Sequence, residues 1–150
     1  MQFLYKKPCR QVGGFSMIEL VVAVSILGIV TAIAVPRYNM YQKRARFLEV
    51  VLAATAYKLP AHYAMQRGAV NSIDELDAGQ FGIPDNLGAG QSPSPYVQSV
   101  TLENGVITGT GTDAVDNAIF RLTASVVEGS GIRWSQDKTA VDSCYALSLC

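Results

Sequence analysis

An apolar run at positions 15–35 constrains this 150-residue chain more than any other feature. Its only charge is Glu19 and its only hydroxyl groups belong to Ser16, Ser25 and Thr31. At about 1.5 Å per residue the run forms a helix of about 31 Å, close to the roughly 30 Å of a bilayer's hydrocarbon core. The run therefore predicts one membrane-spanning helix.

The flanks of this run predict its orientation. Lys6, Lys7 and Arg10 precede it without an acid, so positions 1–14 should stay in the cytoplasm and the rest should be exported. A small pair, Gly13-Gly14, stands before the apolar run rather than after it, unlike an ordinary secretory signal. Cleavage there keeps the hydrophobic helix on the mature chain.

Two positions inside the run and one directly after it are unusual for a membrane helix. An ionisable residue in a span is costly and functional by default, so Glu19 needs a cation at its own depth. Cleavage after Gly14 creates one, the amine of Phe15, one helical turn away. Gly28 and Pro36 are the two weakest helix formers, and they predict a bend or local melting between them.

The segment GFSMIEL at positions 14–20, continued by the apolar run to Pro36, resembles the N-terminal signature of type IV pilins and pseudopilins. The resemblance implies cleavage between Gly14 and Phe15 by a prepilin peptidase, which also methylates Phe15. It implies that Glu19 pairs with the Phe15 amine of a neighbouring subunit and sets register. It also implies that the interval from Gly28 to Pro36 can lose helical structure in the filament.

After Pro36 the pattern becomes that of an amphipathic helix extending to about Arg67, with a second kink at Pro60 and a stop at Gly68. Its apolar face comprises Phe47, Val50, Val51, Ala54, Tyr57 and Ala61. A long loop is expected at 68–95, with a helical turn near 72–78.

Two hairpins are expected beyond the loop. Strands at 96–102 and 106–109 flank Asn104-Gly105, and strands at 118–127 and 132–135 flank positions 128–131. The expected fold is α+β, the type IV pilin fold: a long N-terminal helix packed on a four-stranded antiparallel sheet, with a C-terminal disulfide-bounded region. The expected parts are a removed leader (1–14), a transmembrane and filament-core helix (15–35), and an amphipathic helix with a globular head (36–150).

Cys9 leaves with the leader, so the mature chain keeps Cys144 and Cys150, which predict one disulfide in an exported head. Charge is uneven: six bases lie at positions 37–70 against Glu49, whereas ten acids face three bases from Asn71 onward. This favours a basic helix face that meets acidic neighbours. It disfavours direct binding of DNA, which requires many bases to neutralise phosphates.

The sequence gives little support for a metal site or a catalytic site. Asp113 and Asp116 could bind calcium, but a solvated turn is the simpler interpretation. His62 is the only histidine, so no Ser-His-Asp set can form, and we expect neither an enzyme nor a cofactor or metal.

The resemblance implies a structural subunit that moves from the inner membrane into an extracellular homopolymeric pilus through the pilus assembly machinery. Adhesion, twitching motility and DNA uptake are the implied activities of such a filament. The alternatives are a minor pilin, a pseudopilin of type II secretion, or a membrane-tethered binding module for DNA or a surface ligand.

Overall fold

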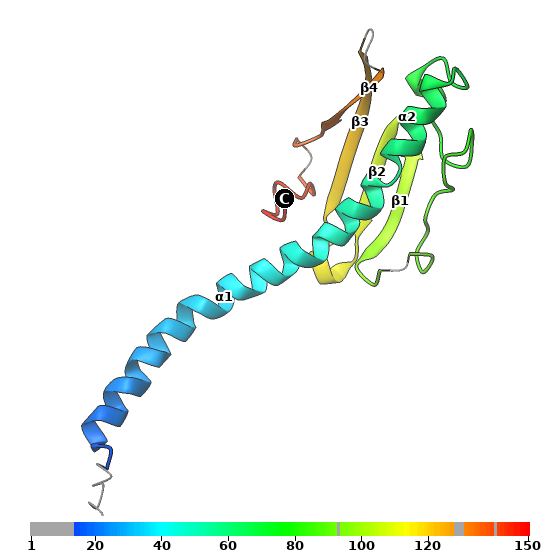
Figure 1. The fold of residues 1–150 in the computed structure, drawn as a ribbon. Helices are drawn as coiled ribbons and strands as arrows, with labels where there is room; N and C mark the ends of the chain where they lie inside the picture. Colours follow the sequence, from blue (N-terminus) through cyan, green and yellow to red (C-terminus); the bar gives the residue numbers. More distant parts are fainter. Residues whose placement is uncertain (1–13, 93, 128–130, 140) are drawn as a thin grey trace, which may run out of the picture. The chain divides into compact units, whose positions relative to one another are not determined.

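The computed structural model describes residues 14–150, except positions 93, 128–130 and 140. The described residues fall into two units, 14–38 and 39–150, which we call the N-terminal segment and the head. Helix α1, Met17–Thr55, begins in the first unit and ends in the second (Figure 1). It starts two residues later than the apolar run because Gly14, Phe15 and Ser16 lie outside the helix.

The predicted kink at Pro60 is present, but it lies before the proline. Helix α1 ends at Thr55, two turn residues follow, and α2 spans Lys58–Gln66. Proline has no N–H, so the carbonyl of Ala56 loses the donor that a continuous helix would give it. The predicted single helix to Arg67 is therefore interrupted at Ala56 and Tyr57.

The predicted stop at Gly68 is confirmed. Gly68 adopts a φ of 69°, and its N–H donates to the carbonyl of Met65 at 3.0 Å. The N–H of Ala69 donates to the carbonyl of Ala64 at 3.1 Å. These two bonds form a Schellman cap, which favours glycine because its φ is positive.

The predicted four-stranded antiparallel sheet is confirmed, in the order β1-β2-β3-β4. Strands β1 (Val97–Glu103) and β2 (Val106–Gly111) pair around Asn104 and Gly105, whose φ angles are 48° and 71°. Two positive φ angles are what the Asn-Gly signal of a tight hairpin predicts. Strands β3 (Ile119–Val127) and β4 (Gly131–Gln136) form the second hairpin, whose turn at 128–130 lies outside the described residues.

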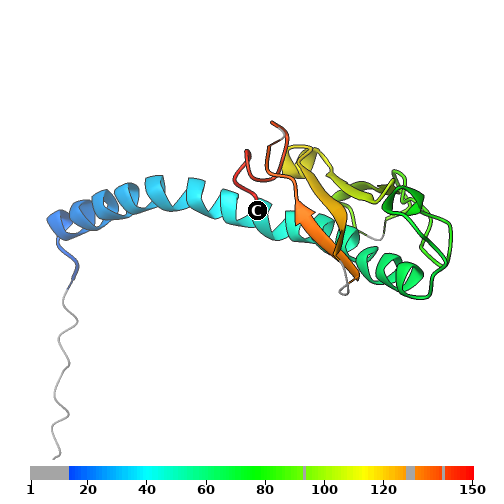
Figure 2. The ribbon, with the colours of Figure 1, turned by 90° about the horizontal axis from the view of Figure 1, so that it is seen from above.

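Helix α2 and the second half of α1 lie along one face of the sheet (Figure 2). The predicted apolar face is confirmed, because Phe47, Val50, Ala54, Tyr57 and Ala61 are all buried, and Val51 is partly buried. Helix and strand approach closely at Gly109 of β2. A Cβ atom added there would lie 3.1 Å from the Cβ of Ala54 and 3.2 Å from Cγ1 of Val50. Because Gly109 has no Cβ, the helix can pack closely against the sheet at this point.

The long loop between α2 and β1 covers the outer edge of β1. Its predicted helical turn is the short 3-10 helix η1, Ile73–Glu75, capped by the Ser72 hydroxyl, which accepts from the N–H of Asp74. Further along, Leu87 and Val100 exchange both backbone hydrogen bonds at 2.9 Å. An unpaired strand edge invites pairing with other chains, and this loop removes that hazard at β1. A second 3-10 helix, η2 (Asp113–Val115), lies between β2 and β3.

Candidate assembly site

The expected cleavage point lies in non-helical backbone. Gly14 and Phe15 precede α1, and the Phe15 side chain is 80% exposed. The carbonyl of Ser16 accepts from the N–H groups of Glu19 and Leu20 at 3.1 and 3.2 Å, so Ser16 is the N-cap residue. The peptide bond between Gly14 and Phe15 therefore lies outside the helix.

Glu19 occupies the third position of the helix and bends back toward its start. Its Oε2 atom accepts from the N–H of Ser16 at 3.5 Å. This is one half of a capping box, the Ser-x-x-Glu pattern in which a glutamate in the first turn receives the N-cap N–H. Sequence reasoning gave Glu19 only the Phe15 amine as a partner, although the spacing of Ser16 and Glu19 carries the capping signal.

The rest of the N-terminal segment exposes its apolar side chains. The helix from Met17 is long and apolar enough to cross a membrane, with a mean hydropathy of 2.6 over its most apolar window. Its two inner hydroxyl groups are satisfied locally. Ser25 donates to the carbonyl of Val21 at 2.7 Å, and Thr31 donates to that of Leu27 at 2.8 Å. The segment therefore suits an apolar environment, because its hydroxyl donors need no water.

Gly28 and Pro36 both lie inside continuous helix in the single chain. A Cβ atom added at Gly28 would have no heavy atom within 4 Å, apart from the neighbouring residues and the backbone of its own helix. Pro36 lacks the N–H that would bond to the carbonyl of Ala32, so one helical hydrogen bond is missing at that point. The interval from Gly28 to Pro36 is thus helical in the single chain, but its helix is less stable than the helix on either side.

Three basic residues of the head's helices bind within the head. Nζ of Lys43 lies 2.7 Å from both carboxylate oxygens of Asp116, so this carboxylate already has a cation. Arg44 donates to the carbonyl of Ser148 at 2.8 Å, and Arg67 donates to that of Phe81 at 2.6 Å. The expected meeting of basic helix and acidic neighbour thus occurs in one ion pair. The two arginines bind loop carbonyls instead.

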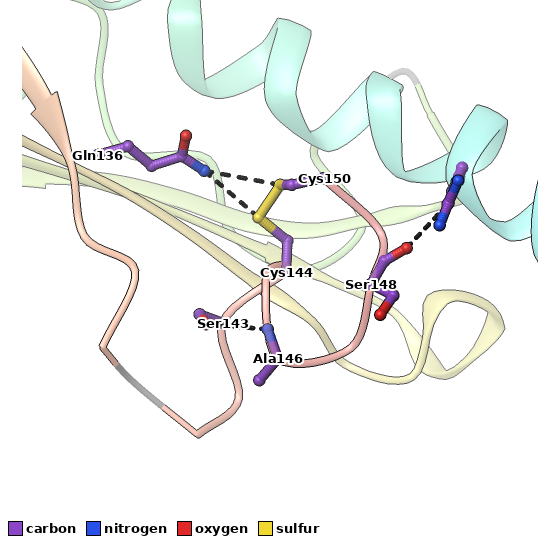
Figure 3. The surroundings of a disulfide bond; sticks show 7 residues. Gln136, Ser143, Cys144, Ala146, Ser148 and Cys150 are labelled. Atoms are coloured by element: carbon purple, nitrogen blue, oxygen red, sulfur yellow. Dashed lines mark hydrogen bonds between the residues drawn. A yellow bond between two sulfur atoms is a disulfide. The ribbon is translucent and has the colours of Figure 1, made fainter.

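The predicted disulfide joins Cys144 and Cys150, whose Cα atoms lie 5.3 Å apart. The amide nitrogen of Gln136 contacts both sulfur atoms, at 3.4 and 3.6 Å (Figure 3). The tail also joins the sheet, because Ile119 donates to the carbonyl of Asp142 and accepts from the N–H of Cys144, both at 3.0 Å. The tail therefore completes β3 where β4 has already ended.

The described residues contain no group of three or more His, Cys, Asp or Glu side chains that could hold a metal ion. Asp113 accepts from the amide of Asn117 at 2.7 Å, while Asp116 binds Lys43. The two carboxylates considered for calcium thus have protein partners.

The described residues thus form an exposed apolar helix with a capped first turn and an α+β head with a disulfide-bounded tail. Comparison with known proteins gives the class. Residues 9–35 match the family model of the prokaryotic N-terminal methylation motif.

Relatives match the head as well. A fimbrial protein of Neisseria meningitidis is 35% identical over 127 residues, covering 81% of this chain and 70% of that protein. The type IV major pilin protein PilE1 of Neisseria gonorrhoeae is 32% identical over 131 residues, covering 81% of this chain and 56% of that protein. The prepilin peptidase-dependent protein D of Escherichia coli is 25% identical over 126 residues, covering 83% and 81%. This chain belongs to the type IV pilin family, the structural subunits of pilus filaments.

Proposed function

We propose that this chain is a major structural subunit of a type IV pilus, released from its leader by cleavage between Gly14 and Phe15 and methylated at Phe15. The observation that carries the proposal is the exposed, apolar N-terminal segment, which has no core of its own and follows a capped helix start. The open backbone at Gly14 and Phe15 supports cleavage there, and the methylation motif at 9–35 supports modification of the new N-terminus.

Glu19 is the proposed register residue of the filament. In the uncleaved chain the nitrogen of Phe15 is an amide, and cleavage turns it into a cation. A subunit misplaced along its neighbour would leave the Glu19 carboxylate and this amine buried and unpaired, which costs several kcal/mol. Correct stacking pairs them, so the charges select one axial position.

The interval from Gly28 to Pro36 is proposed to loosen when the filament forms. Pro36 already removes one hydrogen bond, and Gly28 is a poor helix former. Loosening would lengthen the core and give the fibre compliance. The uninterrupted helix of the single chain supplies the reference state for a comparison with the polymer.

The proposed route begins in the inner membrane, with residues 15–35 in the bilayer and the head outside. Prepilin peptidase and the pilus assembly machinery are the proposed partners, and a second copy of this chain is the partner in the filament. Attachment to surfaces, twitching motility and DNA uptake are proposed as functions of the assembled fibre.

Intact mass of fibres sheared from cells tests the proposal. Wild-type fibres should consist mainly of chains that begin at Phe15 and carry one additional methyl group. Glu19→Ala should be processed and yet fail to join the fibre. Glu19→Asp, which keeps the charge, is the matched control and should retain part of the incorporation.

Fibres that form with this chain rare or absent would contradict a major-subunit role and favour a minor pilin or a pseudopilin. Equal incorporation of Glu19→Ala and wild type would instead contradict only the role of Glu19 in register.

A further inference from the structure

The two helices of the head carry an exposed face made of apolar and basic side chains. Its members are Tyr41, Arg44, Leu48, Leu52 and Lys58, which we call the outer helical face. Positions 41, 44, 48 and 52 repeat at intervals of three and four residues and therefore share one side of α1. Tyr41, Arg44 and Leu48 also line an apolar groove of about 760 Å³ together with Lys58, which places this α2 residue on the same side.

The chemistry of the outer helical face restricts its partner. Tyr41, Leu48 and Leu52 are 70%, 58% and 67% exposed, and a cluster of exposed apolar side chains marks an interaction site. Within the described parts of the chain, neither Arg44 nor Lys58 forms a salt bridge, so both positive charges remain uncompensated. The outer helical face contains no acid. Its partner should therefore offer apolar surface and negative charge together.

A bilayer with anionic headgroups offers both. A helix that lies on such a surface places its leucines at the boundary between headgroups and acyl chains, while its bases attract the anionic lipids. Tyr41 suits the same depth, because its ring is apolar and its hydroxyl group polar. A nucleic acid would satisfy the two bases but would leave Leu48 and Leu52 in water. The combination therefore favours a lipid surface.

The chain itself keeps a bilayer close to this face. Tyr41 follows Val35, the last residue of the apolar run, by six residues. Six residues span about 9 Å as a helix and at most about 22 Å when fully extended. With residues 15–35 in a bilayer, Tyr41 therefore stays within about 22 Å of the end of the span. Such a tether makes the lipid contact intramolecular, so a weak attraction is enough to populate it.

We propose that the outer helical face binds the surface of an anionic bilayer while the subunit waits in the membrane before assembly. The inference rests on the proposed function, which places residues 15–35 in a bilayer. Pro36 allows α1 to bend beside the span, because one helical hydrogen bond is missing there. The bilayer then shields Leu48 and Leu52 from water, and a subunit that enters a filament must first release this contact.

A photo-crosslinking amino acid at Leu52 of the full chain tests the contact in nanodiscs that hold a single copy. Discs of phosphatidylglycerol and phosphatidylcholine in equal parts supply an anionic surface, and discs of phosphatidylcholine alone supply a neutral one. Irradiation should attach at least about fivefold more lipid in the anionic discs, because each base near such a surface adds attraction. The same crosslinker at Thr123, an exposed position on the outer face of β3, is the control and should attach no lipid.

Chains that insert into the discs but give no lipid adduct at position 52 would overturn the inference, as would equal yields in the two kinds of disc. An adduct at Thr123 as strong as that at Leu52 would also overturn it, because contact would then not be specific to this face. Failure of the segment to insert into any disc would instead contradict the membrane stage of the proposed function. The two failures are therefore distinguishable.

Lys58→Gln and Arg133→Gln provide a matched pair for the role of charge. Each removes one positive charge, but Arg133 is exposed on β4 and lies outside the outer helical face. In anionic discs Lys58→Gln should lower the lipid adduct at position 52 by about fivefold, whereas Arg133→Gln should leave it unchanged. Urea unfolding followed by Trp134 fluorescence checks that both heads are folded. Equal effects of the two substitutions would contradict a contact through this face.

Discussion

The same side chain has opposite surroundings in the two units of this protein. Leu20 and Leu27 of the N-terminal segment are 60% and 61% exposed, whereas Leu76 and Leu102 of the head are fully buried. In the head, leucine stabilises a fold that one chain completes by itself. In the segment, leucine has no such partner within the chain, so its contribution appears only when a membrane or a second subunit covers it.

The largest effect is expected when the head is produced without the N-terminal segment. A chain that begins at Asn39 retains every residue of the buried core, so it should be soluble, monomeric and cooperatively folded. The full chain should require detergent, because the apolar surface of segment 15–35 stays exposed. Light scattering and thermal unfolding of both proteins measure the difference. A head that aggregates or melts without a transition would show that it needs the segment.

Matched leucine truncations sharpen the comparison. Leu102→Ala opens a cavity in the core and should lower the free energy of unfolding by about 2–5 kcal/mol. Leu27→Ala should leave it unchanged. Both variants can be unfolded in urea as full chains in detergent, with the fluorescence of the only tryptophan, Trp134, reporting on the head. A loss of stability in Leu27→Ala would mean that the two units are energetically coupled.

Alanine substitution at two glycines should change stability in opposite directions. Gly105 has a φ of 71°, and a Cβ there would clash with the Ile73 side chain, so Gly105→Ala should cost about 1–3 kcal/mol of head stability. Gly28 lies in regular helix, and Gly28→Ala should stabilise that helix by about 1 kcal/mol.

Fibre assembly then separates two interpretations of Gly28. If the interval from Gly28 to Pro36 loosens in the filament, Gly28→Ala should slow assembly, measured as pilin recovered in sheared fibres over time. Unchanged or faster assembly would indicate that this stretch stays helical in the polymer.

The smallest expected effect is a small loss of stability of the head at acid pH. The hydroxyl and N–H of Thr139 donate to Asp137 at 2.7 and 2.9 Å, and with Arg121 they hold the pKa of this carboxyl below its usual value. Because its pKa is lowered in the folded state, the Asp137 carboxylate adds to the free energy of unfolding at neutral pH. This contribution is lost as the pH falls below about 4, through the folded value.

Melting temperatures of wild type and Asp137→Asn should therefore differ slightly at pH 7 and converge toward pH 3. A constant difference over that range would show that the carboxylate charge is not what matters at this position.

Local patterns determined much of this protein from the sequence alone. The helix over the apolar run, the Asn104-Gly105 turn, the Gly68 stop and the Cys144–Cys150 pair each depend on residues close together in the chain, and each is present in the structure. Pro60 was only partly predictable: a missing N–H shows that a break must occur, and the observed break falls before the proline because the carbonyl of Ala56 loses its partner.

Tertiary structure decided what joins distant parts of the chain. Lys43 binds Asp116, Arg44 binds Ser148, and Leu87 pairs with the edge of β1, none of which follows from any local period. Composition showed that basic and acidic halves were available, but only the folded chain brings particular partners within hydrogen-bonding distance.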